Sequence, residues 1–149
     1  MLGAGLLAGL AMLLAAYATF VPAQAVLADP ELQSAKFIAS FAEEPLPRMA
    51  EMPWIFPGGF VGLGFVHALA FHLLRRGLPA SWPRAGLVWG VAAWLVAYPW
   101  FEYYLPWNVM REPLPLVLLE LACWLGVTLA GGLALAFVYR GDLGPGEPH

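Results

Sequence analysis

Charged side chains are scarce in this sequence. Asp, Glu, Lys and Arg make up 11% of the 149 residues, whereas hydrophobic residues make up 61%. So few charges cannot cover the surface of a water-soluble globular domain. The net charge of -3 rests on seven basic and ten acidic residues, so the sequence offers no basic surface for nucleic acid. We therefore expect one integral membrane domain, whose first partner is the lipid bilayer, and no nucleic-acid partner.

Cysteine and the usual catalytic motifs are also lacking. The only cysteine, Cys123, lies in an apolar run, which excludes an intrachain disulfide and a Cys-x-x-Cys metal or redox motif. The sequence contains no His-x-x-x-His, no Gly-x-Ser-x-Gly and no phosphate-binding glycine loop. We therefore expect that the protein is not an enzyme, and that it holds neither a metal nor a cofactor by itself.

What the sequence does contain is apolar segments long enough to cross a bilayer core of roughly 30 Å as α-helices. We identify four of them, residues 2–28, 54–74, 85–105 and 113–139. Pro53, Pro83 and Pro113 lie at or just before helix starts, where a missing backbone N–H costs no hydrogen bond. The sequence therefore predicts an all-α fold, an integral membrane four-helix bundle over residues 1–140, followed by a flexible tail over 141–149.

The first segment has a second interpretation as a signal peptide. Pro22-Ala23-Gln24-Ala25 has the small-x-small form of a signal-peptidase site after an apolar run. No Lys or Arg precedes that run, although a secretory signal carries positive charge there. We expect the first helix to be retained as a membrane span.

The longest connection, residues 29–52, carries half of the ten acidic residues and the only lysine, Lys36. Asp29 followed by Pro30 is a helix-start signal, and apolar residues then recur at helical spacing up to Phe41. We predict an amphipathic interfacial helix over residues 30–44, between the first two spans. The alternative is a mobile linker whose periodicity is accidental.

Orientation follows from the basic residues of the short loops. Arg75, Arg76 and Arg84 lie between the second and third spans, and Arg140 follows the fourth. The opposite side has a thinner supply of basic residues, namely Lys36, Arg48 and Arg111. We predict a multi-pass protein of the cytoplasmic (inner) membrane with both termini in the cytoplasm.

Helices in lipid pack closely where small residues let their backbones approach. Glycines occur four residues apart in the first span (Gly5, Gly9) and in the second (Gly58, Gly62). Gly131 and Gly132 thin the fourth span in the same way. We expect these positions to form helix contacts.

The polar residue that stands out is Glu120, seven residues into the fourth span. A carboxyl group there is costly, so it should face the interior and have a partner. Tyr98 is the first candidate because it is expected at a similar depth. A functional interpretation continues from Glu102 and Glu112 at the outer mouth through Glu120 and Tyr98 to two deeper histidines. In the alternative interpretation, these histidines (His67 and His72) are satisfied core residues and a neutral Glu120 fixes helix register.

An aromatic cluster follows Pro99 on the outer side. Its distinctive members are Trp100, Tyr103, Tyr104, Trp107, Asn108 and Arg111. Aromatic and Arg side chains favour protein interfaces and pockets, and aromatic side chains also anchor helices at the membrane surface. We keep both interpretations, an interface or pocket and a simple anchor.

Three functions fit these features. The first is a small structural or accessory protein that packs with itself or with a larger membrane complex. The second is a small transporter that passes protons or a polar solute by using Glu120 and the histidines. The third is a subunit of an electron-transfer complex with a haem or quinone at a subunit junction. His67 and His72 alone cannot grip one metal, because residues five apart point about 140° away from each other on a helix.

Overall fold

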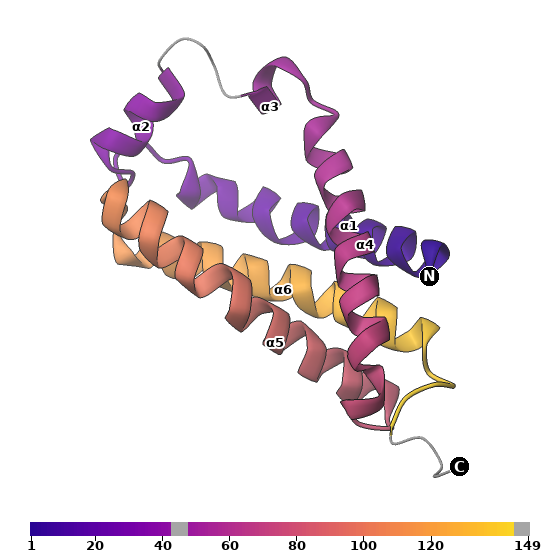
Figure 1. Ribbon diagram of the computed structural model, residues 1–149. Coiled ribbons are helices and arrows are strands. Elements are labelled where there is room, and N and C mark those ends of the chain that lie inside the picture. The colour runs from indigo at the N-terminus through magenta and orange to yellow at the C-terminus, as the bar shows by residue number, and fades with distance from the viewer. Residues whose placement is uncertain (43–47, 145–149) are drawn as a thin grey trace.

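The computed structural model describes residues 1–42 and 48–144, and over these residues the chain folds into helices without a β-strand (Figure 1). The long helices are α1 (Leu2–Leu27), α4 (Ile55–Leu74), α5 (Trp82–Glu102) and α6 (Leu114–Val138). The shorter elements are α2 (Ala35–Ala42), α3 (Arg48–Glu51), the 3₁₀ turn η1 (Arg75–Gly77) and the π-helical segment η2 (Tyr103–Val109). The all-α prediction is confirmed for the described residues.

Helix α6 is the centre of the arrangement. It packs along α1 on one side and along α5 on the other, while α4 packs mainly on α1 and barely reaches α6. Figure 1 shows α1, α5 and α6 running side by side, with α4 crossing them steeply. The described helices therefore form a layer of three with a fourth laid across it, and the four-helix bundle expected from the sequence is not established.

Three helical segments of the described chain are long and apolar enough to cross a membrane, namely α1, Ile55–Gly77 and α6. Helix α5 has the length, at 21 residues, but it is not among these three. Its sequence carries Arg84, Glu102 and two prolines among four tryptophans, which lowers its mean hydropathy. The third span expected at residues 85–105 thus forms a helix, displaced toward the N-terminus, without the apolar character of the other three.

Helix α2 starts later than the predicted 30–44. The Asp29 carboxylate accepts a hydrogen bond from the Glu31 N–H at 2.9 Å, which makes a local turn instead of a helix start. The helix begins after Ser34, whose hydroxyl oxygen accepts the Phe37 N–H at 3.0 Å as an N-cap does. The predicted end, residues 43 and 44, lies outside the described residues.

Glycine sets the crossing of α1 and α4, as expected for Gly5 and Gly9. A methyl group added at Gly9 would lie 2.7 Å from the Phe60 carbonyl oxygen. Gly64 of α4 faces the backbone of both Gly5 and Gly9 at even closer range. Direct contact between the α1 and α4 backbones, instead of extensive side-chain packing, therefore holds this crossing together.

The expectation for Gly58 and Gly62 is wrong. No other element approaches either position, and a methyl group at Gly62 would meet nothing within 4 Å. The contact face of α4 instead carries Gly64 with the buried residues Phe60 and Ala68, one helical turn away on either side. Gly58 and Gly62 lie on the face of α4 that points away from α1.

Helix α6 uses its two adjacent glycines on opposite sides. A methyl group at Gly131 would lie 2.7 Å from the Met12 side chain of α1. Gly132 faces α5 and lies against the backbone of Gly86 and Gly90. The pair therefore lets α6 approach both neighbours at the same level.

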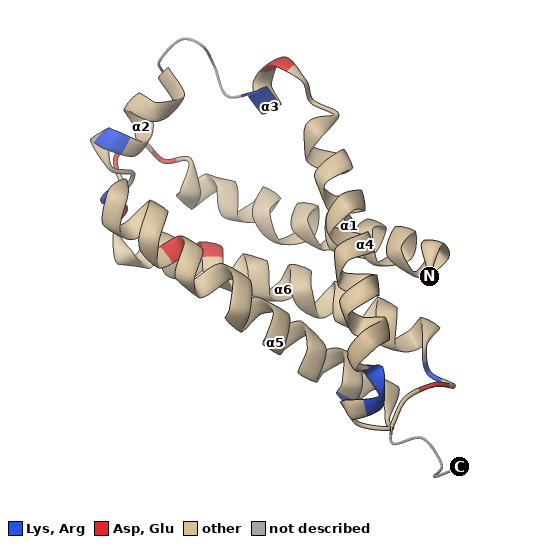
Figure 2. Ribbon diagram, in the orientation of Figure 1, with Lys and Arg blue, Asp and Glu red and all other residues tan. Residues whose placement is uncertain are grey.

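The basic loops gather at one end of the molecule, which we call the basic end. It holds the link between α4 and α5 together with the end of α6 (Figure 2). The Arg75 guanidinium lies 5.8 Å from the centre of the Tyr139 ring, and the Arg140 guanidinium lies 4.4 Å from that of Phe137. The N-terminus of α1 points toward the same side of the molecule (Figure 1).

The glycine crossing predicts unequal effects of two neighbouring substitutions. Gly64→Ala should lower the free energy of unfolding by about 1–3 kcal/mol, because the added methyl group would press on the α1 backbone. Gly62→Ala, the matched control on the same helix, should be neutral or stabilising by up to about 1 kcal/mol through its better helix propensity. Thermal unfolding in detergent compares them. Equal stability of the two variants would contradict the crossing.

Candidate functional site

The site lies where α5 and α6 run antiparallel, each presenting one residue in every four to the other helix. The stripe on α5 is Gly86, Gly90, Trp94, Tyr98 and Glu102, and that on α6 is Gly132, Thr128, Trp124 and Glu120. Such rows of residues four apart form the ridges by which helices pack. Each stripe begins with glycine near the basic end and finishes with a glutamate near the opposite end.

Contacts between the stripes change in character along their length. A methyl group at Gly90 would lie 2.8 Å from the Leu129 Cα, so the backbones touch at the glycine end. Further along, the Trp94 indole N–H donates to the Leu121 carbonyl at 2.9 Å. The Tyr98 ring then stacks on Trp124 with ring centres 4.6 Å apart.

At the far end of the stripes, Glu102 and Glu120 meet. Their side chains are neighbours, close enough to interact. Glu102 is only 1% exposed, and its Oε2 atom is buried with no hydrogen-bond partner among the described residues. Two bare negative charges side by side in such surroundings are strongly disfavoured, so at least one of the two groups carries a proton or is neutralised by a cation.

This pairing corrects the expectation that Tyr98 is the partner of Glu120. Tyr98 lies one helical turn before Glu102 on the same stripe, and its ring packs on Trp124. The α-helical part of α5 ends at Glu102 instead of 105. The partner is therefore the residue that was expected only at the outer mouth.

A cavity of about 400 Å³ opens beside the carboxyl pair, between the end of α1, α2 and α6. Its apolar lining includes Phe20, Leu27, Phe37, Ile38 and Phe41. Its polar lining includes Gln24, Gln33 and Glu120, of which Glu120 is the only charged residue. Of the two carboxyl groups, the one that lines the cavity is therefore that of Glu120.

Helix α2 is held over this cavity by the link between α5 and α6. The Ser34 N–H donates to the Glu112 carboxylate at 3.2 Å, and the Ser34 hydroxyl donates to the Met110 carbonyl at 2.6 Å. Glu112 is 6% exposed, so this contact is shielded from solvent. A carboxylate at a helix N-terminus also interacts favourably with the helix dipole.

The backbone at Arg111 turns Glu112 inward. Arg111 has a φ of 63°, in the left-handed region that residues other than glycine rarely adopt. The next residue, Glu112, then donates its N–H to the Pro106 carbonyl at 2.9 Å. Arg111 and Asn108 line a shallow surface pocket of about 360 Å³ with Trp107 and Glu112.

The aromatic residues of this cluster form one exposed surface at the end of α5 and along η2. The ring centres of Trp100 and Tyr103 are 5.8 Å apart, and those of Tyr103 and Trp107 are 5.1 Å apart. Tyr104 stacks beside Trp100 at 6.1 Å. All four side chains are exposed, so the cluster faces away from the helix core.

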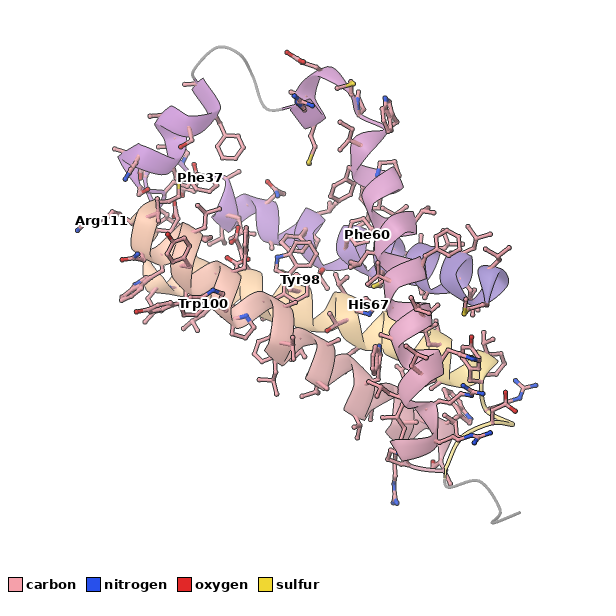
Figure 3. All side chains as sticks on the ribbon, in the orientation of Figure 1. Phe37, Phe60, His67, Tyr98, Trp100 and Arg111 are labelled. Carbon is pink, nitrogen blue, oxygen red and sulfur yellow. The ribbon has the colours of Figure 1, made fainter. Side chains whose placement is uncertain are left out.

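The structure does not bring the histidines to the carboxyl pair. His67 packs edge-on against Trp89 at 6.1 Å, and His72 lies 5.7 Å from the Tyr139 ring at the basic end. Trp89 precedes Glu102 by about 20 Å along α5. Figure 3 shows His67 on α4, apart from Tyr98. The Nδ1 atoms of both histidines are buried, without a hydrogen-bond partner in the part of the chain that the structure describes.

Over residues 1–42 and 48–144, no three His, Cys, Asp or Glu side chains come together as metal ligands would. Cys123 is buried, with its sulfur 3.7 Å from the Thr19 carbonyl. No family model, curated protein sequence or solved structure matches this chain.

The docking of α2 gives a prediction on local stability. Glu112→Ala should remove the acceptor of the Ser34 N–H, and a hydrogen bond to a charged group contributes about 1.5–3 kcal/mol. Amide exchange of residues 35–42 should therefore become at least about tenfold faster, while α1 and α6 keep their protection. Glu31→Ala, at an exposed position, is the control. Unchanged exchange in α2 of the Glu112 variant would contradict this docking.

Proposed function

We propose that this chain is a small multi-pass membrane protein that binds and passes protons or small cations at the Glu102–Glu120 pair. The observation that supports this function most strongly is that the buried carboxyl group of Glu102 lies next to the half-buried carboxyl group of Glu120, beside a cavity that contains no basic side chain among its described lining residues. An ionisable residue inside a membrane segment is costly and is typically retained for function. A purely structural pair could use an amide in place of one acid.

The arrangement of polar and aromatic residues favours exchange with one side. The cavity joins Glu120 to the end of the molecule that carries α2. Toward the basic end, the Trp124 ring is surrounded by Phe20 at 5.0 Å, Phe60 at 6.4 Å and Tyr98 at 4.6 Å. These rings fill the interior next to the carboxyl pair. In this conformation the pair therefore exchanges protons or cations with the α2 side.

We further propose that α5 is a fourth span and that the protein lies in the cytoplasmic membrane with both termini in the cytoplasm. The antiparallel packing of α5 along α6 supports the fourth span, because the two helices cover the same depth. The basic end supports the orientation, since Lys and Arg of short loops stay on the cytoplasmic side. The cavity then faces the outer side.

A second candidate function is that of an accessory protein that packs with a second copy or with another membrane protein. The observation that favours it is the exposed aromatic surface of Trp100, Tyr103, Tyr104 and Trp107. Aromatic side chains contribute strongly at protein interfaces. This surface lies outside the carboxyl pair, so both functions can reside in one protein.

Glu120→Gln tests the leading function. The variant should fold with nearly wild-type thermal stability in detergent, because the amide can still donate and accept a hydrogen bond. In liposomes with an imposed pH gradient, the wild type should carry a proton or cation flux above that of empty liposomes. The variant should lose this flux, since an amide cannot titrate or neutralise a cation.

Glu31→Gln is the matched control, because this acid is exposed on the turn before α2, and it should keep the flux. Wild-type flux that persists in a folded Glu120→Gln protein would show that the pair does not carry the ion. Absence of flux in every protein would contradict the transport function and favour the accessory one.

A further inference from the structure

The cavity beside Glu120 has more aromatic surface than a site for a proton or a bare metal ion needs. We propose that it binds an organic ammonium ion, with the charged nitrogen at Glu120, the member of the carboxyl pair that lines the cavity, and an apolar substituent under α2. This inference rests on the proposed function and names the class of cation that the site takes.

The positive charge of the ligand follows from Glu120, the one charged side chain among the described residues that line the cavity. Its neighbour Glu102 is almost fully buried, and the Glu102 Oε2 atom has no hydrogen-bond partner among the described residues. No described Lys or Arg lines the cavity, and a further acid, Glu112, borders a small void together with Glu120. A ligand with N–H donors and a positive charge supplies what the protein leaves out.

The apolar part of the ligand follows from the walls. Phe20 comes from α1, whereas Phe37 and Phe41 come from α2 with ring centres 4.9 Å apart. Aromatic faces attract ammonium groups and also bury apolar substituents. The walls would offer little to an inorganic cation, which prefers six or so oxygen ligands.

The cavity also offers few oxygen atoms as ligands for an inorganic cation. Besides Glu120, the polar lining side chains are Gln24 and Gln33. The Gln33 amide nitrogen already donates to the Leu27 carbonyl at 2.5 Å, which leaves one amide oxygen free. Two amides and one carboxylate suit a single ammonium group better than a metal ion.

The size of the cavity agrees with an organic ligand. Its volume of about 400 Å³ falls within the range of roughly 300–1,000 Å³ that is usual for small-molecule sites. A lone cation with one or two waters would leave most of the volume unfilled, because a water takes about 30 Å³. A ligand of about ten non-hydrogen atoms would fit with its nitrogen inward.

Helix α2 provides the roof of the site and a second readout. Its fixed point is the contact of Ser34 with Glu112, and its apolar side chains Phe37, Ile38 and Phe41 line the cavity. A ligand that bridges these side chains and Glu120 would hold α2 against α6. Amide exchange of residues 35–42 should therefore slow on binding.

The experiment uses the purified full chain in an uncharged detergent and three probes. These are phenethylammonium, its neutral isostere phenethyl alcohol, and potassium chloride. Calorimetry should detect saturable binding of phenethylammonium, with binding of the alcohol and of potassium at least about tenfold weaker, as expected for loss of a charge-assisted hydrogen bond. Slower exchange in α2 should accompany binding of phenethylammonium alone.

Two variants locate the ligand. Glu120→Gln should weaken phenethylammonium binding by at least about tenfold, and Phe41→Ala, at an exposed position on α2, should weaken it without disturbing the fold. Glu31→Gln should bind as the wild type does. Thermal unfolding of each protein verifies that it is folded.

The outcomes separate this inference from the proposed function. Flux that depends on Glu120 without phenethylammonium binding would overturn the inference and keep the proposed function. Potassium binding as strong as that of phenethylammonium would have the same consequence. Equal binding of the alcohol, or unchanged binding in Glu120→Gln, would also overturn it. Glu120-dependent binding of phenethylammonium without any flux would support the inference and contradict transport.

Discussion

Direct contact of two helix backbones positions everything else in this protein. In lipid, apolar side chains gain little by leaving one apolar environment for another, so helices associate where small residues allow close approach. Gly86 and Gly90 of α5 meet Gly132 and Leu129 of α6 in this way, and that contact fixes how far one helix is shifted along the other. The same register stacks Tyr98 on Trp124 and brings Glu102 to Glu120. A shift of one turn would separate the two acids.

The elements outside this helix pair complete the site. Helix α1 packs on the other side of α6 through Met12 and Gly131, and its last turns form one wall of the cavity. Helix α2 forms the roof, held by the hydrogen bond from Ser34 to Glu112. The strained backbone at Arg111 is what directs Glu112 toward that bond. The three acids Glu102, Glu112 and Glu120 thus gather at the end of the molecule opposite the basic end.

The sequence predicted the helices better than their contacts. Apolar runs placed the four long helices within a few residues, because length and composition decide what can be helical in lipid. The spacing of glycines does not show which of them face a neighbouring helix. It points to Gly62 as a contact position, whereas Gly64 makes the contact with α1. The start of α2 depends on Glu112, which lies 78 residues away from Ser34 and is invisible to local helix-start rules. The partner of Glu120 is hidden for a different reason. The rows of residues four apart that end at Glu102 and Glu120 can be seen in the sequence. How the two rows align is set by the glycine contact between α5 and α6, which the sequence does not show.

The site depends on a direct interaction between the Glu102 and Glu120 carboxyl groups. A double-mutant cycle of thermal stability in detergent measures this interaction from Glu102→Gln, Glu120→Gln and the doubly substituted protein. Direct contact predicts a coupling free energy of about 0.5–3 kcal/mol, as found for residues in contact. Effects of the two substitutions that add to within about 0.3–0.5 kcal/mol, the behaviour of distant sites, would contradict it.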